Sequence, residues 1–242
     1  MKVDELLLLT GNDIPFPKAK LIIHQPHIRD IGLIEESNFF TGCHFLLIDK
    51  NQISFEDKNG LDIQTNFDIF IAAMNSRDQA PHKVAAKMVL ALLFPEAKIK
   101  IEKDKILLQF ENFASELNKE NFSEFQSIIA QMFCFERDSE DFNPADALAK
   151  RIADKIKEAK QKKAERKGEN LDKVAVYSKY ISILAVGLKK SMIDLSNYTI
   201  YQLRDEFKRF QLKQDFDIYI KAKLAGAQDL EEVENWMEDI HP

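Results

Sequence analysis

The chain has 242 residues, 45% of them hydrophobic, and a formal net charge of −6. A chain of this length and composition can build one large or two modest hydrophobic cores, so general disorder is excluded. Seven glycines and seven prolines are too few for collagen-like, low-complexity or linker-dominated architectures, and a helix-rich protein is expected.

The two cysteines indicate a reducing compartment. Cys43 and Cys134 lie among apolar residues, in GCHFLL and QMFCF, where a buried reduced thiol is favoured over a disulfide. The aliphatic run at residues 6–9 follows two acids and is too short for a signal peptide. No stretch reaches the roughly 20 apolar residues that span a bilayer. We therefore expect a soluble, unsecreted protein without membrane contact.

The first 24 residues alternate apolar runs with turn signals. They predict a strand or short helix, a turn, and a strand at residues 21–24 that ends before Pro26. Apolar residues then follow at helical spacing, at Ile28, Ile31, Leu33 and Ile34, so an amphipathic helix is expected there. The next segment, IDKNQISFEDKNGLD, is polar, with Asn59-Gly60 as a predicted tight turn.

Residues 66–75 and 83–94 predict two apolar helices, the second of which Pro95 ends. The segment KIKIEKDKILLQFE alternates apolar and polar residues on both sides of Lys103-Asp104, which predicts a β-hairpin. Ser123 and Gln126 have the spacing of a capping box, so a helix is expected to begin there.

Asn143-Pro144 marks the predicted boundary between two parts. Asn is a good N-cap and Pro a good first helical residue, so a helix is expected from Pro144 to Gly168. The predicted organisation is an α+β domain at 1–142, a basic connecting helix at 143–170 and a helical C-terminal domain at 171–242. The expected fold class is helix-rich α+β, with a small antiparallel sheet packed on helices, followed by a mainly α-helical part.

The C-terminal part carries more aromatic side chains than exposed helices can hold. An apolar helix is expected at residues 174–188, and Thr199 with Gln202 predicts a capping box at the start of the next helix. Asp229 and Glu232 predict a short last helix around the single tryptophan. The aromatic face packs either on the protein's own core or, in part, on a partner or a second copy. The candidate partner-binding residues are Tyr201, Phe207, Phe210 and Trp236.

Charge is unevenly distributed along the chain. Residues 150–167 hold nine Lys/Arg and three acids, whereas residues 229–242 hold six acids and no Lys or Arg. The basic run is interpreted as a solvated helix or a surface for an acidic partner, with nucleic-acid binding as the alternative. It lacks aromatic residues for base stacking and a hydrophobic face for a membrane. The residues that would carry either contact are Lys160, Lys162, Lys163, Arg166 and Lys167.

No sequence motif predicts catalysis. The chain has no G-x-S-x-G, P-loop or G-x-G-x-x-G motif, and no cofactor is expected. His24 and His27 have a metal-ligand spacing, but Pro26 between them is expected to point the rings differently, and no acid cluster is evident beside them. A structural role is therefore favoured for both histidines, and an enzyme is not expected.

Two stretches resemble proteins encoded in the tail modules of tailed bacteriophages and prophages of Firmicutes-like hosts. They are LIIHQPHIRDIGLIEESNFFTG near the start and NYTIYQLRDEFKRFQLKQDFDIYIKAKLAGAQDLEEVENWMEDIH at the end, together roughly a third of the chain. Such proteins are usually described as tail assembly chaperones or as tail and baseplate structural proteins.

The resemblance implies a non-enzymatic role in virion morphogenesis and contributes no active-site residues. It implies other tail or virion proteins as partners, with a homo-oligomer as a further option, and a location in the bacterial cytoplasm or in the virion. The rival hypothesis is a nucleic-acid-binding protein that uses the basic run.

Overall fold

A computed structural model describes residues 1–50, 65–76, 80–135, 176–228, 233 and 235–237. The predicted turn at Asn59-Gly60, the basic connecting helix and the capping box at Asp229 and Glu232 lie outside these residues. The predicted three-part division of the chain therefore stays a prediction.

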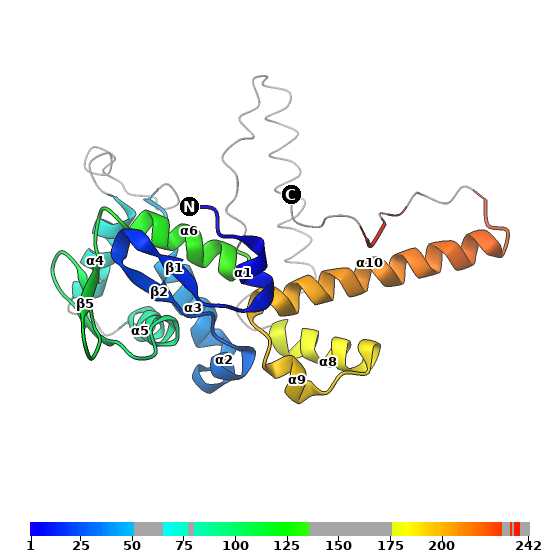
Figure 1. Ribbon diagram of the computed structural model, residues 1–242, viewed down its shortest axis with the longest axis horizontal. Coiled ribbons are helices and arrows are strands. Elements are labelled where there is room, and N and C mark those ends of the chain that lie inside the picture. Colours follow the sequence, from blue (N-terminus) through cyan, green and yellow to red (C-terminus); the bar gives the residue numbers. More distant parts are fainter. Residues whose placement is uncertain (51–64, 77–79, 136–175, 229–232, 234, 238–242) are drawn as a thin grey trace, which may run out of the picture.

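The N-terminal part of the chain is a layered α+β body (Figure 1). Its helices and strands, in chain order, are α1 (Glu5–Thr10), β1 (Ile14–Phe16), the 3-10 turn η1 (Pro17–Ala19), β2 (Leu21–Ile23), α2 (Ile28–Ile34), α3 (Glu36–Leu46), α4 (Asn66–Asn75), α5 (Pro81–Leu93), β3 (Lys98–Ile101), β4 (Ile106–Gln109), β5 (Ala114–Leu117) and α6 (Phe122–Met132).

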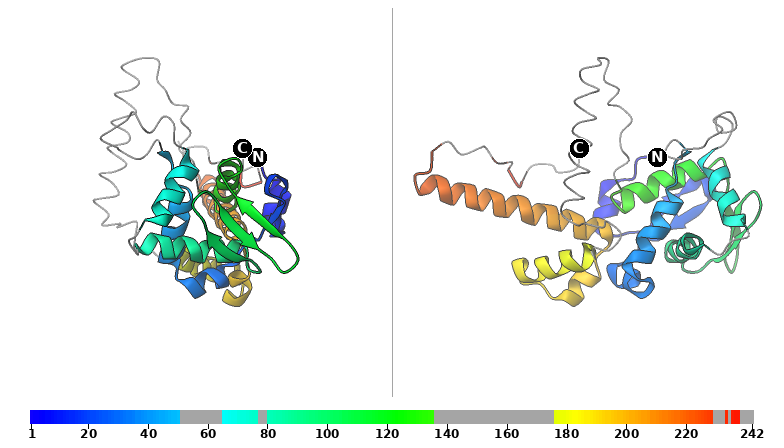
Figure 2. Two further views of the ribbon diagram at one scale, coloured as in Figure 1. Left: turned by 90° about the vertical axis from the view of Figure 1, so that its left-hand side faces the viewer. Right: turned by 180° about the vertical axis from the view of Figure 1, so that it is seen from behind.

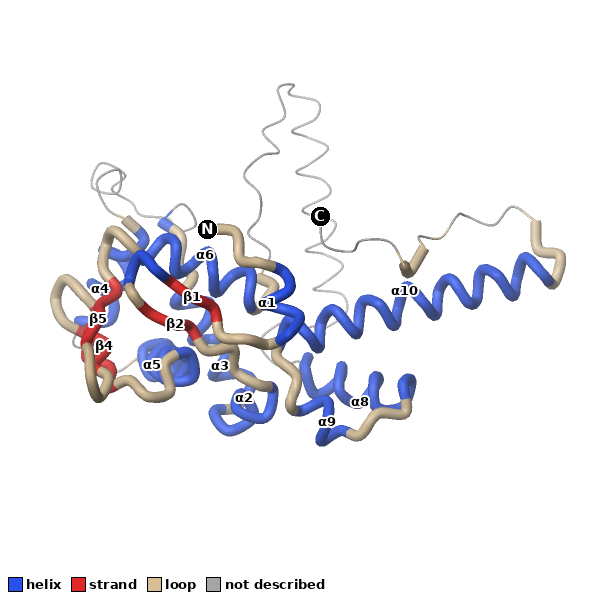
Figure 3. Tube along the Cα trace, in the orientation of Figure 1, coloured by secondary structure: helices blue, strands red, loops and turns tan. Residues whose placement is uncertain are grey.

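The strands form two small antiparallel sheets (Figure 3). In the first, Ile14 on β1 pairs with Ile23 on β2. The second has the order β3-β4-β5, and Ile106 on its middle strand pairs with Ile101 and Leu117. Alternate residues of β4 are buried, as expected for a sheet with one face on the core.

Phenylalanine side chains dominate the core between these sheets and helices α3, α5 and α6. Seven of them are fully buried: Phe16, Phe39, Phe70, Phe94, Phe122, Phe125 and Phe133. Helices α3 and α5 come closest at Gly42, where an added Cβ would lie 2.5 Å from the carbonyl oxygen of Ala85. Only glycine permits this approach of two backbones.

The C-terminal part is helical and consists of α8 (Val176–Leu188), α9 (Met192–Ser196) and α10 (Ile200–Leu224). Helix α8 lies beside the first half of α10, α9 packs against α8 and α2, and the second half of α10 extends away from the body (Figures 1 and 2). The fold class is therefore confirmed as helix-rich α+β with a helical C-terminal part. Among the described helices, none is long and apolar enough to cross a membrane.

The two parts share one hydrophobic core. Tyr177 of α8 stacks on Phe40 of α3, with ring centroids 5.3 Å apart. At the start of α10, the backbone N–H of Ile28 donates to the carbonyl of Tyr198 at 2.9 Å, and Arg29 donates to Asn197 at 2.7 Å. The C-terminal helices are thus fixed against the N-terminal body by packing and by hydrogen bonds.

Several local predictions are confirmed and one is wrong. The helix predicted at 66–75, the hairpin around Lys103-Asp104 and the Thr199–Gln202 capping box are all present, and the helix predicted at 174–188 is described from Val176 to Leu188. The predicted capping box at Ser123 is not present, because the N-cap of α6 is Asn121, two residues earlier. Gln126 is instead buried and donates to the carbonyls of Leu46 and Ile48. Sequence patterns also missed α3, β5 and α9.

Candidate protein-binding surface

Helices α8 and α10 pack through aromatic residues that the sequence had singled out. Tyr180 of α8 stacks on Phe207 of α10, with ring centroids 4.0 Å apart and an interplanar angle of 16°. One turn further along α10, Phe210 lies against Gly187, where there is no room for a Cβ atom. Both phenylalanines are half-buried, so most of their side-chain surface is already covered by the protein itself.

Polar contacts support the same helix pair. Lys190, which follows α8, bonds to the carboxylate of Glu206 and, at 2.8 Å, to the hydroxyl of Tyr198. Burial opposes the charged form of Lys190, but these two hydrogen bonds raise its pKa above the ordinary value. This ammonium therefore stays charged at neutral pH and ties the loop after α8 to α10.

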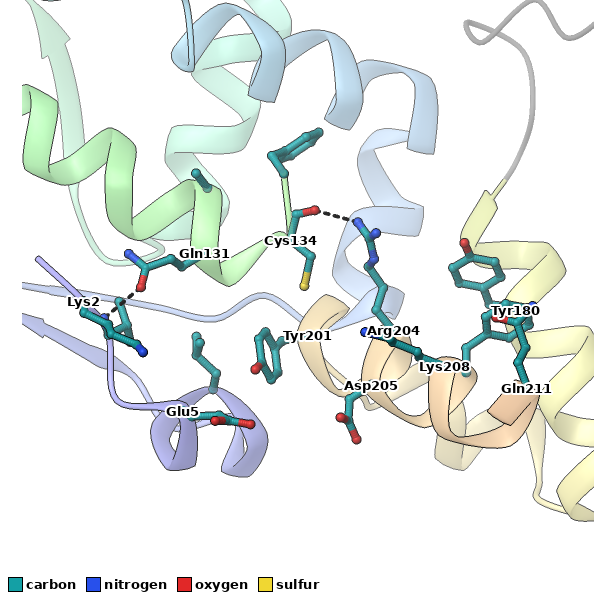
Figure 4. A pocket seen from close by; sticks show the side chains of 15 residues that line it. Lys2, Glu5, Gln131, Cys134, Tyr180, Tyr201, Arg204, Asp205, Lys208 and Gln211 are labelled. Atoms are coloured by element: carbon teal, nitrogen blue, oxygen red, sulfur yellow. Dashed lines mark hydrogen bonds between the residues drawn. The ribbon is translucent and has the colours of Figure 1, made fainter. Parts of the chain in front are cut away.

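A groove of about 730 Å³ lies between α1, the end of α6 and the first half of α10 (Figure 4). Its lining includes Tyr201 and Phe207, two of the predicted partner-binding residues. Arg204 crosses the groove and donates to the carbonyl of Cys134 at 2.8 Å. On the opposite wall, the backbone N–H of Val3 donates to Gln131 at 2.9 Å.

Charged and aromatic side chains line the groove, together with the thiol of Cys134, whose pKa is raised. Burial raises the pKa of Cys134 to about 11, although the nearby charge of Arg204 acts in the opposite direction. Cys43 is fully buried, and burial raises its pKa as well. Both cysteines are free, as expected. Neither has the lowered pKa that an activated cysteine nucleophile needs.

The predicted partner-binding residues do not form one exposed patch. Tyr201 is 7% exposed and belongs to the core. Trp236 is half-buried, and its carbonyl accepts a hydrogen bond from Arg209 at 2.9 Å, which places this residue against α10. The basic residues 160, 162, 163, 166 and 167 lie outside the described part of the chain.

The second half of α10 instead presents an apolar surface that sequence patterns did not identify. Four residues at intervals of four, Leu212, Phe216, Ile220 and Leu224, form a stripe along the helix, and we call them the α10 stripe. Ile220 is 37% and Leu224 83% exposed. No other described helix or strand lies beside this half of α10 in either view (Figures 1 and 2). The spacing was readable in the sequence, but the exposure of Ile220 and Leu224 was not.

The two histidines lie closer together than the sequence indicated. The ring centroids of His24 and His27 are 6.1 Å apart, and Asp30 lies beside them. The expectation that Pro26 would point the rings differently, with no Cys or acid cluster beside them, did not anticipate this arrangement.

The chain was compared with protein families, with curated proteins and with solved structures. No curated protein and no solved structure gives a significant match. Residues 171–241, the segment that contains α8, α9 and α10, match the family model of the YomV second domain.

Proposed function

We propose that this protein is a prophage-encoded, non-enzymatic assembly protein that binds other virion proteins, including tail proteins, through the α10 stripe. The observation that carries the proposal is the exposure of Ile220 and Leu224, the last two residues of that stripe, on a helix that extends beyond the body of the protein. An amphipathic helix with anchors at regular turns is a recurrent element of protein recognition, because it fits a hydrophobic groove on a partner.

The energetics of the helix support this proposal. Short helices with little tertiary packing are only marginally stable in water, and most helical stability comes from a buried apolar face. Covering Ile220 and Leu224 would remove apolar area from water at about 25 cal/mol per Å². A partner would therefore stabilise the second half of α10 as it binds.

The family match supports the biological setting. YomV is a Bacillus prophage-associated protein. The resemblance of residues 21–42 and 197–241 to tail-module proteins narrows the proposed partners to tail or virion proteins. The raised pKa of Cys134 supports the non-enzymatic part of the proposal, because the thiol in the groove is poorly ionised near neutral pH.

The proposal is tested by co-purification of the tagged full-length protein from prophage-induced cells, with mass spectrometry of the recovered proteins. We expect the wild type to recover tail or virion proteins that remain bound at moderate salt. The double variant Ile220→Gln/Leu224→Gln is expected not to recover them. Gln suits a helix, so these substitutions remove the apolar anchors without breaking α10. Particles from the same cells show whether the protein stays in the virion or leaves after assembly.

Leu33→Gln is the matched control, because Leu33 is 84% exposed, like Leu224, but lies on α2. It is expected to recover the same proteins as the wild type. Equal recovery by the α10 double variant would refute the role of the stripe. Light scattering on the same variants tests whether the stripe also joins two copies of the chain.

Nucleic-acid binding is the second candidate, favoured by the nine Lys/Arg within residues 150–167. Here we expect DNA or RNA that dissociates steeply with rising salt, because counterion release drives such binding. Replacing Lys160, Lys162, Lys163, Arg166 and Lys167 with Gln would abolish it. Absence of nucleic-acid binding at low salt would remove this candidate.

A further inference from the structure

Three potential metal ligands gather where β2 leads into α2. His24 directly follows β2, His27 is the N-cap of α2, and Asp30 lies in the first turn of that helix. Their ligand atoms all lie within 4.8 Å of one another, and all three residues are half-buried. His24, His27 and Asp30 are spaced three residues apart. The chain passes from the end of β2 into the first turn of α2 over these residues, so their side chains come together at one point.

From this geometry we infer that His24, His27 and Asp30 bind a first-row divalent transition-metal ion such as Zn²⁺. Two imidazoles and one carboxylate suit such an ion, whereas Mg²⁺ and Ca²⁺ prefer sites built from oxygen ligands alone. Three protein ligands also leave a fourth position of a tetrahedral ion open for water or for a donor from a partner.

One pair of ligand atoms, which also takes part in the hydrogen bonds that cap α2, has a separation compatible with a bound metal. Nδ1 of His27 and Oδ2 of Asp30 are 3.3 Å apart. Two donors bound tetrahedrally at about 2.0–2.1 Å from one zinc ion lie about 3.3 Å from each other. The ligand atom of His24 lies within 4.8 Å of both of these donors.

Asp13 supplies a supporting contact that metal-bound histidines usually have. Its Oδ1 lies 2.8 Å from Nδ1 of His24, which leaves Nε2 of that ring as the ligand atom. A carboxylate on the other ring nitrogen fixes the tautomer and the orientation of a ligating histidine, and its loss typically weakens metal binding 10- to 100-fold. Asp13 is therefore a positioning residue for the site.

The backbone that carries the ligands is anchored on several sides. The N–H of His24 donates to the carbonyl of Leu93 at 3.0 Å. Between the histidines, the side chain of Gln25 is fully buried and donates to the carbonyls of Leu7 and Asn12. His27 itself forms a β-bridge with Thr199, the N-cap of α10. A bound ion would therefore reinforce the junction between the N-terminal body and the start of α10.

The experiment titrates ZnCl₂ into the tag-free, chelator-treated full-length protein by calorimetry, and Co²⁺ is followed by its visible absorption. We expect one ion per chain, a tetrahedral Co²⁺ spectrum and a rise in melting temperature with Zn²⁺, since a ligand that binds the native state stabilises it. The variants His24→Gln and His27→Asn are expected to weaken binding at least 10-fold and to lose the spectrum. Asn is a good N-cap, so the second variant preserves the start of α2.

His44→Gln is the control, because His44 is exposed on α3 and lies outside the cluster. It is expected to bind Zn²⁺ like the wild type. Asp13→Asn leaves all three metal ligands in place and tests the positioning of His24. We expect this variant to bind Zn²⁺ more weakly while its circular dichroism spectrum stays unchanged. The inference is overturned if the wild type binds no Zn²⁺, or if His24→Gln and His27→Asn bind it as tightly as the wild type.

Discussion

Phe210 of α10 lies so close to Gly187 of α8 that a Cβ atom at position 187 would overlap its ring. One turn earlier, Phe207 stacks on Tyr180. The spacing between the two helices therefore depends on an aromatic side chain that fits against a residue without a side chain. This contact fixes the direction in which α10 leaves the body of the protein.

Gly187→Ala is expected to destabilise the protein by about 1–3 kcal/mol, because overpacking costs more than the gain in helix propensity. Gly32→Ala is the matched control, since Gly32 lies in α2 with open space around its Cα, and a gain of about 0.5–1 kcal/mol is expected there. Urea unfolding of both variants measures the difference. A stabilised Gly187→Ala protein would contradict the close contact with Phe210.

Gln126→Ala is expected to cost about 2–4 kcal/mol, because it leaves the carbonyls of Leu46 and Ile48 without their donor in a buried position. Ser123→Ala is expected to change stability by less than about 0.5 kcal/mol, since Ser123 is not the N-cap of α6. The same unfolding experiment compares them. The reverse order of the two effects would restore the capping box predicted from the sequence.

Asp68 connects the start of α4 to Lys119 near α6. Burial acts to raise its pKa, but hydrogen bonds from the Thr65 backbone and from Lys119 lower it below the ordinary value of 3.8. A lowered carboxyl pKa contributes stability above pH 3.8 that is lost as the pH falls through the pKa of the folded state.

Asp68→Asn is therefore expected to cost about 1 kcal/mol at pH 7, and the difference from the wild type should shrink as the pH falls below 3.8. Denaturant unfolding at several pH values checks this. Asp104→Asn, in the exposed turn of the β-hairpin, serves as the control and should not reproduce the trend. A difference that grows in acid would contradict the assigned hydrogen bonds.

Cys134 is expected to react slowly with iodoacetamide in the folded protein. Because its pKa is raised to about 11, its thiolate fraction at pH 8 is about 100-fold lower than that of a free cysteine. The rate should rise about tenfold per pH unit between pH 8 and 10. Mass spectrometry measures it, with protein in urea as the reference. Rapid labelling at pH 8 would reveal an activated thiol and reopen the question of catalysis.

Local signals in the sequence determined many of the elements. The alternation of apolar residues in 98–109 set the hairpin, and Thr199 with Gln202 set the start of α10, because these patterns act within a few residues of chain. The four-residue spacing of the apolar residues in the α10 stripe can also be read from the sequence. Such features need no distant partner to form.

Tertiary structure decided what those elements do. Gln126 had the spacing of a capping-box residue, but its side chain donates hydrogen bonds to the carbonyls of Leu46 and Ile48, about 80 residues away along the chain. Tyr201 and Phe207 were candidates either for the core or for a binding surface; Tyr201 is buried, and Phe207 packs against the core. His24, His27 and Asp30 converge because Leu93, Leu7 and Tyr198 anchor the backbone around them. Burial and long-range hydrogen bonding depend on segments that fold together, so a local pattern does not reveal which side chains remain available for binding.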